Sequence, residues 1–204
     1  MGRVIQFPGN PSSGFGLKKV KGTKKVERQE ELGQLNIFAP AKEGRVIQMP
    51  EGGDYFEHAI KLDESGDSLA KEAYSRAVEM GQSSADALCN LGVLQYNNGE
   101  ENEALDSFTK ALGIDARHRE AHFNLANLYS EKGNAQLAIL HYEAAISVDS
   151  NFSDGFYNLG LVLITDRQFK KALKILSAYR MMTHGDDKEV NGLIDNLKMT
   201  LDNE

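Results

Sequence analysis

A repeat of 34 residues in the middle of the chain constrains its fold more than any other feature of the sequence. Three related segments, 85–92, 119–126 and 153–160, start 34 residues apart, and each carries Asn-Leu at its sixth and seventh places. Each unit of a repeat must bury its apolar face on a neighbour. The period therefore predicts a stack of similar units instead of one globular core.

Each unit contains two segments whose apolar residues recur at helical spacing. In the first clear unit they are Leu88, Leu91 and Leu94, followed by Ala104, Phe108 and Ala111. Between the two segments, Gly99 provides the left-handed residue that commonly ends a helix, and Gly133 and Arg167 occupy the equivalent places of the next units. The pattern predicts two antiparallel helices per unit.

Small residues recur where two helices of a unit must approach each other closely. They are Gly92, Ala126 and Gly160 on the first helix, and Ala104, Ala138 and Ala172 on the second. A bulky side chain at such a place would overpack the joint, at a typical cost of about 1–3 kcal/mol. We therefore expect these positions to be contacts between closely packed helices.

Three motifs of this unit resemble the tetratricopeptide repeat family. They are Leu88-x-x-Leu-Gly92, Ala104-x-x-x-Phe108-x-x-Ala111 and Ile114-Asp115, and the resemblance covers roughly residues 54–182. It implies an all-α protein, a right-handed α-solenoid of helix-turn-helix repeats. The chain departs from the family pattern at Ala126, where glycine is usual, and at Ala116 and Ser150, where proline is usual; these are tolerated substitutions.

We expect the chain to divide into a tail, four repeats and a closing helix. The tail covers residues 1–50, a degenerate first repeat 51–84, three clear repeats 85–118, 119–152 and 153–182, and a C-terminal capping helix 186–203. Asp186 is expected to open the last helix, with Glu189 three residues on completing a capping box. The apolar stripe of this helix closes the end of the stack or, alternatively, forms a dimer surface.

The tail and the repeats carry opposite charge. The whole chain has a net charge of −7, whereas residues 1–28 hold seven Lys and Arg residues and one Glu. Residues 9–23 are rich in Gly, Ser, Pro, Asn and Lys without periodicity, which predicts a largely disordered segment. Such asymmetry indicates that tail and repeats bind different partners or bind each other.

A short motif occurs twice before the repeats. Gly2-Arg-Val-Ile-Gln-Phe-Pro8 recurs as Gly44-Arg-Val-Ile-Gln-Met-Pro50, with Phe7 against Met49 as the single difference. The motif is either a linear segment that docks in extended form or a local duplication within a linker, which we favour. Residues 32–38, another apolar island, are a further candidate docking segment.

The sequence contains no constellation of residues for catalysis, a metal or a cofactor, so we expect a non-enzyme. His118 and His122 have only Glu120 as a third ligand nearby, and zinc needs three or four convergent ligands. Cys89, the single cysteine, has aromatic counterparts in the next repeats, and aromatic neighbours give a thiolate no stabilising charge. The chain has neither a signal-peptide core nor a run of about 20 apolar residues for a membrane span. We therefore expect a cytoplasmic protein that does not contact a membrane.

The family resemblance implies a concave groove lined by the first helix of each repeat. Carried onto this chain, its four rows of residues are Asp86, Glu120 and Asp154; Cys89, Phe123 and Tyr157; Asn90, Asn124 and Asn158; and Val93, Asn127 and Leu161. The first row is an acidic edge, the second is largely aromatic and the third is a ladder of amides. A groove of this kind implies a peptide as its ligand.

The amide ladder suggests how such a peptide is held. An Asn side chain offers an acceptor and two donors, which match the C=O and N–H groups of an extended backbone. A similar ladder binds peptides in this way in the repeats of the transferase that attaches N-acetylglucosamine to Ser and Thr. The alternative is that asparagine at this place stabilises contacts between repeats.

Charge narrows the class of peptide that we expect. The clamp with which some family members bind a free C-terminal carboxylate needs Lys and Arg. The corresponding places here hold Phe56, Ile60, Glu120 and Asn124, which disfavours that ligand. The acidic row instead favours a basic or neutral segment, with an association rate that falls as salt rises.

Three functions remain open from the sequence. The first is a scaffold or adaptor that binds a protein segment in the groove. The second is a nucleic-acid-associated regulator whose tail lysines, Lys18, Lys19, Lys21, Lys24 and Lys25, contact phosphate. The third is self-regulation, in which the basic tail or one copy of the duplicated motif lies in the chain's own acidic groove.

A weaker resemblance bears on the second function. The Gln34–Phe38 segment, the Val-Ile-Gln-Met-Pro linker and the repeats together resemble bacterial proteins in which a MerR-type helix-turn-helix precedes such an array. The segment before the repeats has no room for that DNA-binding domain, so we do not expect this chain to read DNA sequence.

Overall fold

The computed structural model describes residues 17–19, 54–185 and 187–203, and helices are the only regular secondary structure within them. The helices are α1 (Tyr55–Glu64), α2 (Ala70–Glu79), α3 (Ser84–Asn97), α4 (Glu101–Ile114), α5 (Arg119–Glu131), α6 (Ala135–Val148), α7 (Ser153–Thr165), α8 (Phe169–Met182) and α9 (Lys188–Leu201). Both copies of the duplicated motif and residues 32–38 lie outside the described residues.

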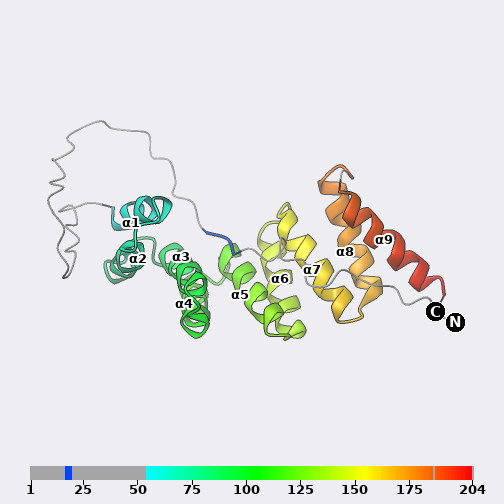
Figure 1. Cartoon of the computed structure of the whole chain (residues 1–204), viewed down its shortest axis with the longest axis horizontal. Helices are drawn as coiled ribbons and strands as arrows, with labels where there is room; N and C mark the ends of the chain where they lie inside the picture. The colour runs from blue at the N-terminus through cyan, green and yellow to red at the C-terminus, as the bar shows by residue number, and fades with distance from the viewer. Residues whose placement is uncertain (1–16, 20–53, 186, 204) are drawn as a thin grey trace.

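The helices form an elongated stack in which each helix packs against the next one along the chain. Figure 1 shows α1 to α9 following one another along the long axis of the molecule. The first helices of neighbouring repeats also meet, since α3 contacts α5 directly. The sequence prediction of an all-α solenoid is confirmed.

The apolar interior is divided along the stack instead of being gathered in one core. One cluster joins α1, α2 and α3, a second joins α3, α4 and α5, and a third runs from α5 to α9. Each repeat therefore buries its apolar face on its neighbours, as a fixed period requires.

The turn between the two helices of a repeat adopts the predicted left-handed conformation. Gly99 and Gly133 have φ angles of 80° and 74°, and Arg167, which replaces glycine in the next repeat, has a φ angle of 58°. Glycine adopts this conformation without a steric cost, whereas an L residue such as arginine pays for the approach of its Cβ to the backbone. The prediction from the 34-residue register is correct at all three places.

The small residues lie where the helices of a repeat come closest. A Cβ atom added to Gly92 would lie 2.6 Å from the ring of Phe108, and one added to Gly160 would lie 2.3 Å from Leu176. Ala104, Ala138 and Ala172 are fully buried on the partner helices. The predicted steric reason for these residues is confirmed.

The closing helix begins one residue later than the sequence pattern suggests. Its N-cap is Asp187, whose side chain accepts hydrogen bonds from the N–H groups of Glu189 and Val190. The assignment of Asp186 as the opening residue is therefore wrong, because Asp187 supplies the carboxylate for these N–H groups. The apolar stripe is used inside the molecule: α9 packs on α8 and buries Val190, Leu193, Ile194 and Leu197.

Candidate functional site

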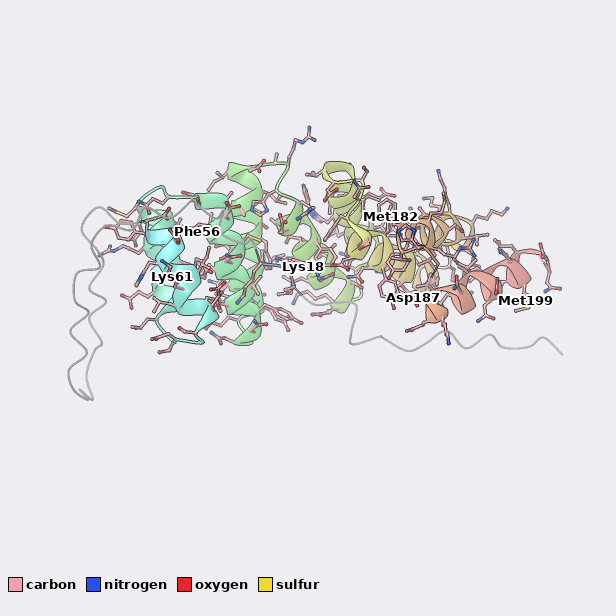
Figure 2. All side chains as sticks on the ribbon, turned by 90° about the horizontal axis from the view of Figure 1, so that it is seen from above. Lys18, Phe56, Lys61, Met182, Asp187 and Met199 are labelled. Atoms are coloured by element: carbon pink, nitrogen blue, oxygen red, sulfur yellow. The ribbon has the colours of Figure 1, made fainter. Side chains whose placement is uncertain are left out.

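The tail segment Leu17–Lys19 lies against the middle of the stack. In Figure 1 it is the blue stretch that reaches α5, and Figure 2 labels Lys18 between the two ends of the molecule. Its partners lie on α1, α3, α5 and α7. We call the face formed by these four helices around Leu17–Lys19 the groove.

Asn124 of α5 holds the backbone of this segment. The N–H of Lys18 donates to Asn124 Oδ1 at 2.6 Å, and Asn124 Nδ2 donates to the C=O of Lys18 at 2.7 Å. One amide thus satisfies both polar backbone groups of one residue, which is the complementarity between an Asn side chain and an extended peptide. Asn124 itself is fully buried, so neither of its polar atoms is available to water.

Two carboxylates bind the lysines of the segment. Lys19 Nζ lies 2.6 and 2.7 Å from the two oxygens of Asp63 on α1. Lys18 Nζ forms an ion pair with Asp154 on α7. Successive side chains of an extended chain point in opposite directions, so adjacent lysines reach helices near the two ends of the groove. Leu17 completes the contact by packing against the apolar cluster of α3, α4 and α5.

The backbone of Lys18 also covers the only cysteine. Cys89 Sγ lies 3.9 Å from the C=O of Lys18, and the thiol is fully buried. Burial raises the pKa of the Cys89 thiol, and the negative charge of Glu120 raises it further. A thiol with a raised pKa stays protonated and is a poor nucleophile.

A pocket of about 450 Å³ adjoins the segment on the α1 side of the groove. Leu17–Lys19 forms one wall, and the other walls are Ile60, Asp63, Glu64, Tyr74, Asn90, Val93 and Asn97. Tyr74 OH donates to Asp63 Oδ2 at 3.2 Å and accepts from Asn90 Nδ2 at 3.2 Å. Burial, followed by the charge of Asp63, raises the pKa of Tyr74, so its hydroxyl remains a donor that orients this carboxylate.

The three carboxylates of the predicted acidic row have different partners. Asp86 Oδ1 lies 3.0 Å from Nε2 of the buried His118, and Glu120 is paired with Arg119. Asp154 is the member of this row that pairs with the tail, through Lys18. The negative charge of Glu120 is therefore balanced within the repeats by Arg119.

The three amides of the predicted ladder also differ in what they bind. All three are buried, and within the described part of the tail, residues 17–19, the backbone of Lys18 bonds to Asn124. Asn90 donates to Tyr74, and Asn158 donates to Asn127 Oδ1 at 3.2 Å. Asn158 Oδ1 is a buried oxygen without a hydrogen-bond partner among the described residues. In this structure Asn90 and Asn158 thus support contacts between neighbouring helices.

The remaining predicted residues line or support the groove to different degrees. Phe123 is fully buried between the rings of Tyr142 and Phe152, whereas Tyr157 is half-buried against Tyr179, with ring centroids 5.4 Å apart. Val93 borders the pocket. Asn127 accepts from Tyr142, and Leu161 belongs to the cluster of α5 to α9.

Sequence reasoning missed Asp63, the second acidic end of the groove. Asp63 lines the same pocket as Asn97, but the turn at Gly66 lies 33 residues before the turn at Gly99, so the 34-residue register does not align these two residues. The shortened turn at Gly66 in the first repeat obscured that register. His118, one of the two histidines weighed above against the needs of a zinc site, caps α5 by accepting from the N–H of Ala121.

Two other kinds of site are absent from the part of the chain that the structure describes. No group of three or more His, Cys, Asp or Glu side chains there could hold a metal ion. No helix within the same residues combines the length and the apolar character that a bilayer crossing requires. Lys21, Lys24 and Lys25, the other lysines proposed to contact nucleic acid, lie outside the described residues.

Known proteins resemble this chain in sequence motifs and in fold. Residues 68–118 and 120–152 match family models described as tetratricopeptide repeat. No curated protein matches the chain in sequence.

Three solved structures illustrate the similarity in fold. A crystal structure of MamA protein has a TM-score of 0.59 and 23% identity over 72% of this chain and 86% of that one. A tetratricopeptide repeat protein from Parabacteroides merdae has a TM-score of 0.62 and 21% identity over 74% and 62%. The first repeat domain of Spaghetti (RPAP3), bound to the HSP90 peptide SRMEEVD, has a TM-score of 0.53 and 17% identity over 57% and 92%. At these identities the likeness shows the fold.

Proposed function

Because this chain is an array of tetratricopeptide repeats, we propose that it is a scaffold whose groove binds an extended segment of a partner protein. The observation that carries the proposal is the pair of hydrogen bonds between Asn124 and the backbone of Lys18. An extended segment of any sequence other than proline presents the same N–H and C=O groups. The contact therefore holds a polypeptide without reference to its side chain at this point.

The charges around Asn124 favour a basic or neutral ligand. Asp63 and Asp154 lie towards the two ends of the groove, and each binds a lysine ammonium in this structure. An acidic peptide such as the one bound to the RPAP3 domain would meet these carboxylates instead of cations. The places of the carboxylate clamp hold Phe56, Ile60, Glu120 and Asn124, which supplies no positive charge for a free C-terminus.

Asn158 offers a further contact for a ligand that extends along the groove. It lies one repeat beyond Asn124, and its Oδ1 has no hydrogen-bond partner among the described residues. A buried acceptor without a donor costs about 1–3 kcal/mol. A backbone N–H of a partner segment that reached this oxygen would remove that cost, which supports a ligand longer than three residues.

The nucleic-acid alternative receives no such support. Lys18 and Lys19 are the tail lysines that the structure describes, and both ammonium groups are paired with carboxylates of the repeats. Phosphate contacts from these two residues would require both ion pairs to break. We therefore retain peptide binding as the proposed function.

Selection from a library of random 12-residue peptides displayed on phage tests the proposal. The bait is the full chain, both as wild type and with Lys18→Glu and Lys19→Glu, because these lysines already occupy the groove. Selected peptides are then made with a fluorescein label, and their affinity is measured by fluorescence anisotropy. We expect basic or neutral peptides whose affinity falls roughly tenfold in Asn124→Ala, since two hydrogen bonds are lost.

The matched control is Asn151→Ala, which removes an exposed amide in the loop between α6 and α7. It should leave the affinity unchanged. Failure of both baits to select any peptide would contradict the proposal, and so would peptides that bind Asn124→Ala as tightly as wild type.

A further inference from the structure

The tail segment Leu17–Lys19 contacts the groove through its backbone and its side chains, as a bound peptide would. These contacts indicate which class of partner segment fits the groove and what such a partner must displace. Resting on the proposed function, we propose that Leu17–Lys19 is an internal competitor that occupies the groove of its own chain. A partner segment then binds by displacing it, and carries the same pattern of one apolar residue followed by two basic residues.

Each residue of the segment makes a different kind of contact. Leu17 packs on the apolar cluster of α3, α4 and α5, Lys18 pairs with Asp154, and Lys19 pairs with Asp63. The backbone hydrogen bonds to Asn124 fix the register, because they engage Lys18 alone. With Lys18 held in this position, Leu17 lies at the apolar cluster of α3, α4 and α5, and Lys19 lies at Asp63. The groove therefore selects an order of residue types as well as a charge.

The second lysine is the stronger determinant of this pattern. The side chain of Asp63 is only 10% exposed and is oriented by Tyr74, whereas the Lys18 and Asp154 side chains are 44% and 45% exposed. Exposed ion pairs contribute little because water and salt screen them. Leaving the Asp63 carboxylate, which is largely shielded from water, without a cation is more costly. Loss of Lys19 should therefore weaken the contact more than loss of Lys18.

The connection between the segment and the repeats makes the chain itself the occupant. Only residues 20–53 separate Lys19 from Asp54, so the segment is never far from the groove. A tether of this length typically gives an effective concentration on the order of a millimolar. If the free segment had a dissociation constant of about 0.1 mM, a competing ligand would bind roughly tenfold more weakly to the intact chain.

Binding of a partner would thus be coupled to the release of a basic segment. Displacement frees the Lys18 and Lys19 ammonium groups from Asp154 and Asp63. The same carboxylates then bind the basic residues of the partner. The affinity of a partner is set by the difference between its contacts and those of Leu17–Lys19, and not by its own contacts alone.

A fluorescein-labelled peptide with the sequence of residues 14–22, Gly-Phe-Gly-Leu-Lys-Lys-Val-Lys-Gly, is the probe for the first experiment. Its affinity is measured by anisotropy for the full chain and for the full-length Lys19→Glu variant. We expect the variant to bind the probe at least about tenfold more tightly, because its own segment no longer competes. Lys61→Glu is the matched control: it makes the same charge change on α1, where Lys61 is paired only loosely with Glu57, and should give no comparable gain.

Cys89 reports occupancy without any added ligand. It is the only cysteine, and Lys18 covers its sulfur in the full chain. We expect the rate of its reaction with 5,5′-dithiobis(2-nitrobenzoic acid) to rise at least about fivefold in the full-length variant with Lys18→Glu and Lys19→Glu. Unchanged circular dichroism would show that the repeats remain folded in that variant.

The outcomes separate this inference from the proposed function. Equal probe affinity for wild type and Lys19→Glu, together with equal Cys89 rates, would overturn the internal competitor while leaving peptide binding intact. A faster Cys89 reaction in a variant that binds neither the probe nor any library peptide would support the internal contact and refute peptide binding. A dimer, measured by light scattering, that dissociates when Lys18 and Lys19 are changed to Glu would identify a second copy as the occupant and overturn the inference.

Discussion

Replacing Gly160 with alanine tests whether close helix contact inside a repeat limits which side chains fit. The added Cβ would lie 2.3 Å from Leu176 Cδ2 and 2.6 Å from its Cγ, and Leu176 is fully buried. Overpacking of this kind costs about 1–3 kcal/mol. Alanine also favours the helix over glycine by about 1 kcal/mol. The free energy of unfolding of Gly160→Ala should therefore fall by up to about 2 kcal/mol.

Gly192→Ala isolates the steric part of this effect. Gly192 lies in the middle of α9 with nothing within 4 Å of the position that a Cβ would take. This variant should be stabilised by about 0.5–1 kcal/mol through helix propensity alone. Urea denaturation followed by circular dichroism should place Gly160→Ala about 1–3 kcal/mol below Gly192→Ala. Equal stability of the two variants would refute the steric account of the small residues.

Two further predictions concern strain and charge. Arg167→Gly should raise the free energy of unfolding by about 1 kcal/mol, because Arg167 has a φ of 58° in the turn where the other repeats carry glycine. Thermal denaturation measures this effect, and an unchanged or lowered melting temperature would contradict it. Burial, followed by the neighbouring His122, lowers the pKa of His141 to about 4, so the folded chain resists the proton that the unfolded chain accepts below pH 6.5. The free energy of unfolding should therefore fall as the pH is lowered from about 6.5 to about 4, by at most about 2 kcal/mol for this partly exposed group. In urea titrations at several pH values, His141→Asn should lose this part of the pH dependence. The same pH dependence in His141→Asn and wild type would refute the prediction.

The fold could be predicted from the sequence because equivalent positions of each repeat meet the same packing constraint and therefore carry similar residues. The period located the helices, the left-handed turns and the small residues, including Arg167 in a glycine position. The residue that caps α9 was harder to predict. Asp186 and Asp187 are adjacent carboxylates, and only their positions relative to the first turn of α9 decide which one caps it.

The candidate site was less predictable, because the repeat register predicts the helix face on which a residue lies but not the residue that it contacts. Asn90, Asn124 and Asn158 are equivalent in the repeat, yet their neighbours differ: Tyr74 lies beside Asn90, Lys18 beside Asn124 and Asn127 beside Asn158. In the same way, His118, at the end of its repeat, forms a hydrogen bond with Asp86. The charge asymmetry between the tail and the repeats did favour contact between them, but it identified neither Lys18 nor Asp63 as the residues concerned.

Hydrogen exchange at a single amide tests most directly whether the groove holds a polypeptide backbone. The N–H of Lys18 donates to the buried Oδ1 of Asn124, so its exchange in the full chain, followed by NMR, should be slowed well below the rate of an unstructured peptide. In Asn124→Ala this protection should disappear while the amides of α5 stay protected. A Lys18 amide that exchanges freely in the wild type, or that stays protected in Asn124→Ala, would contradict the account.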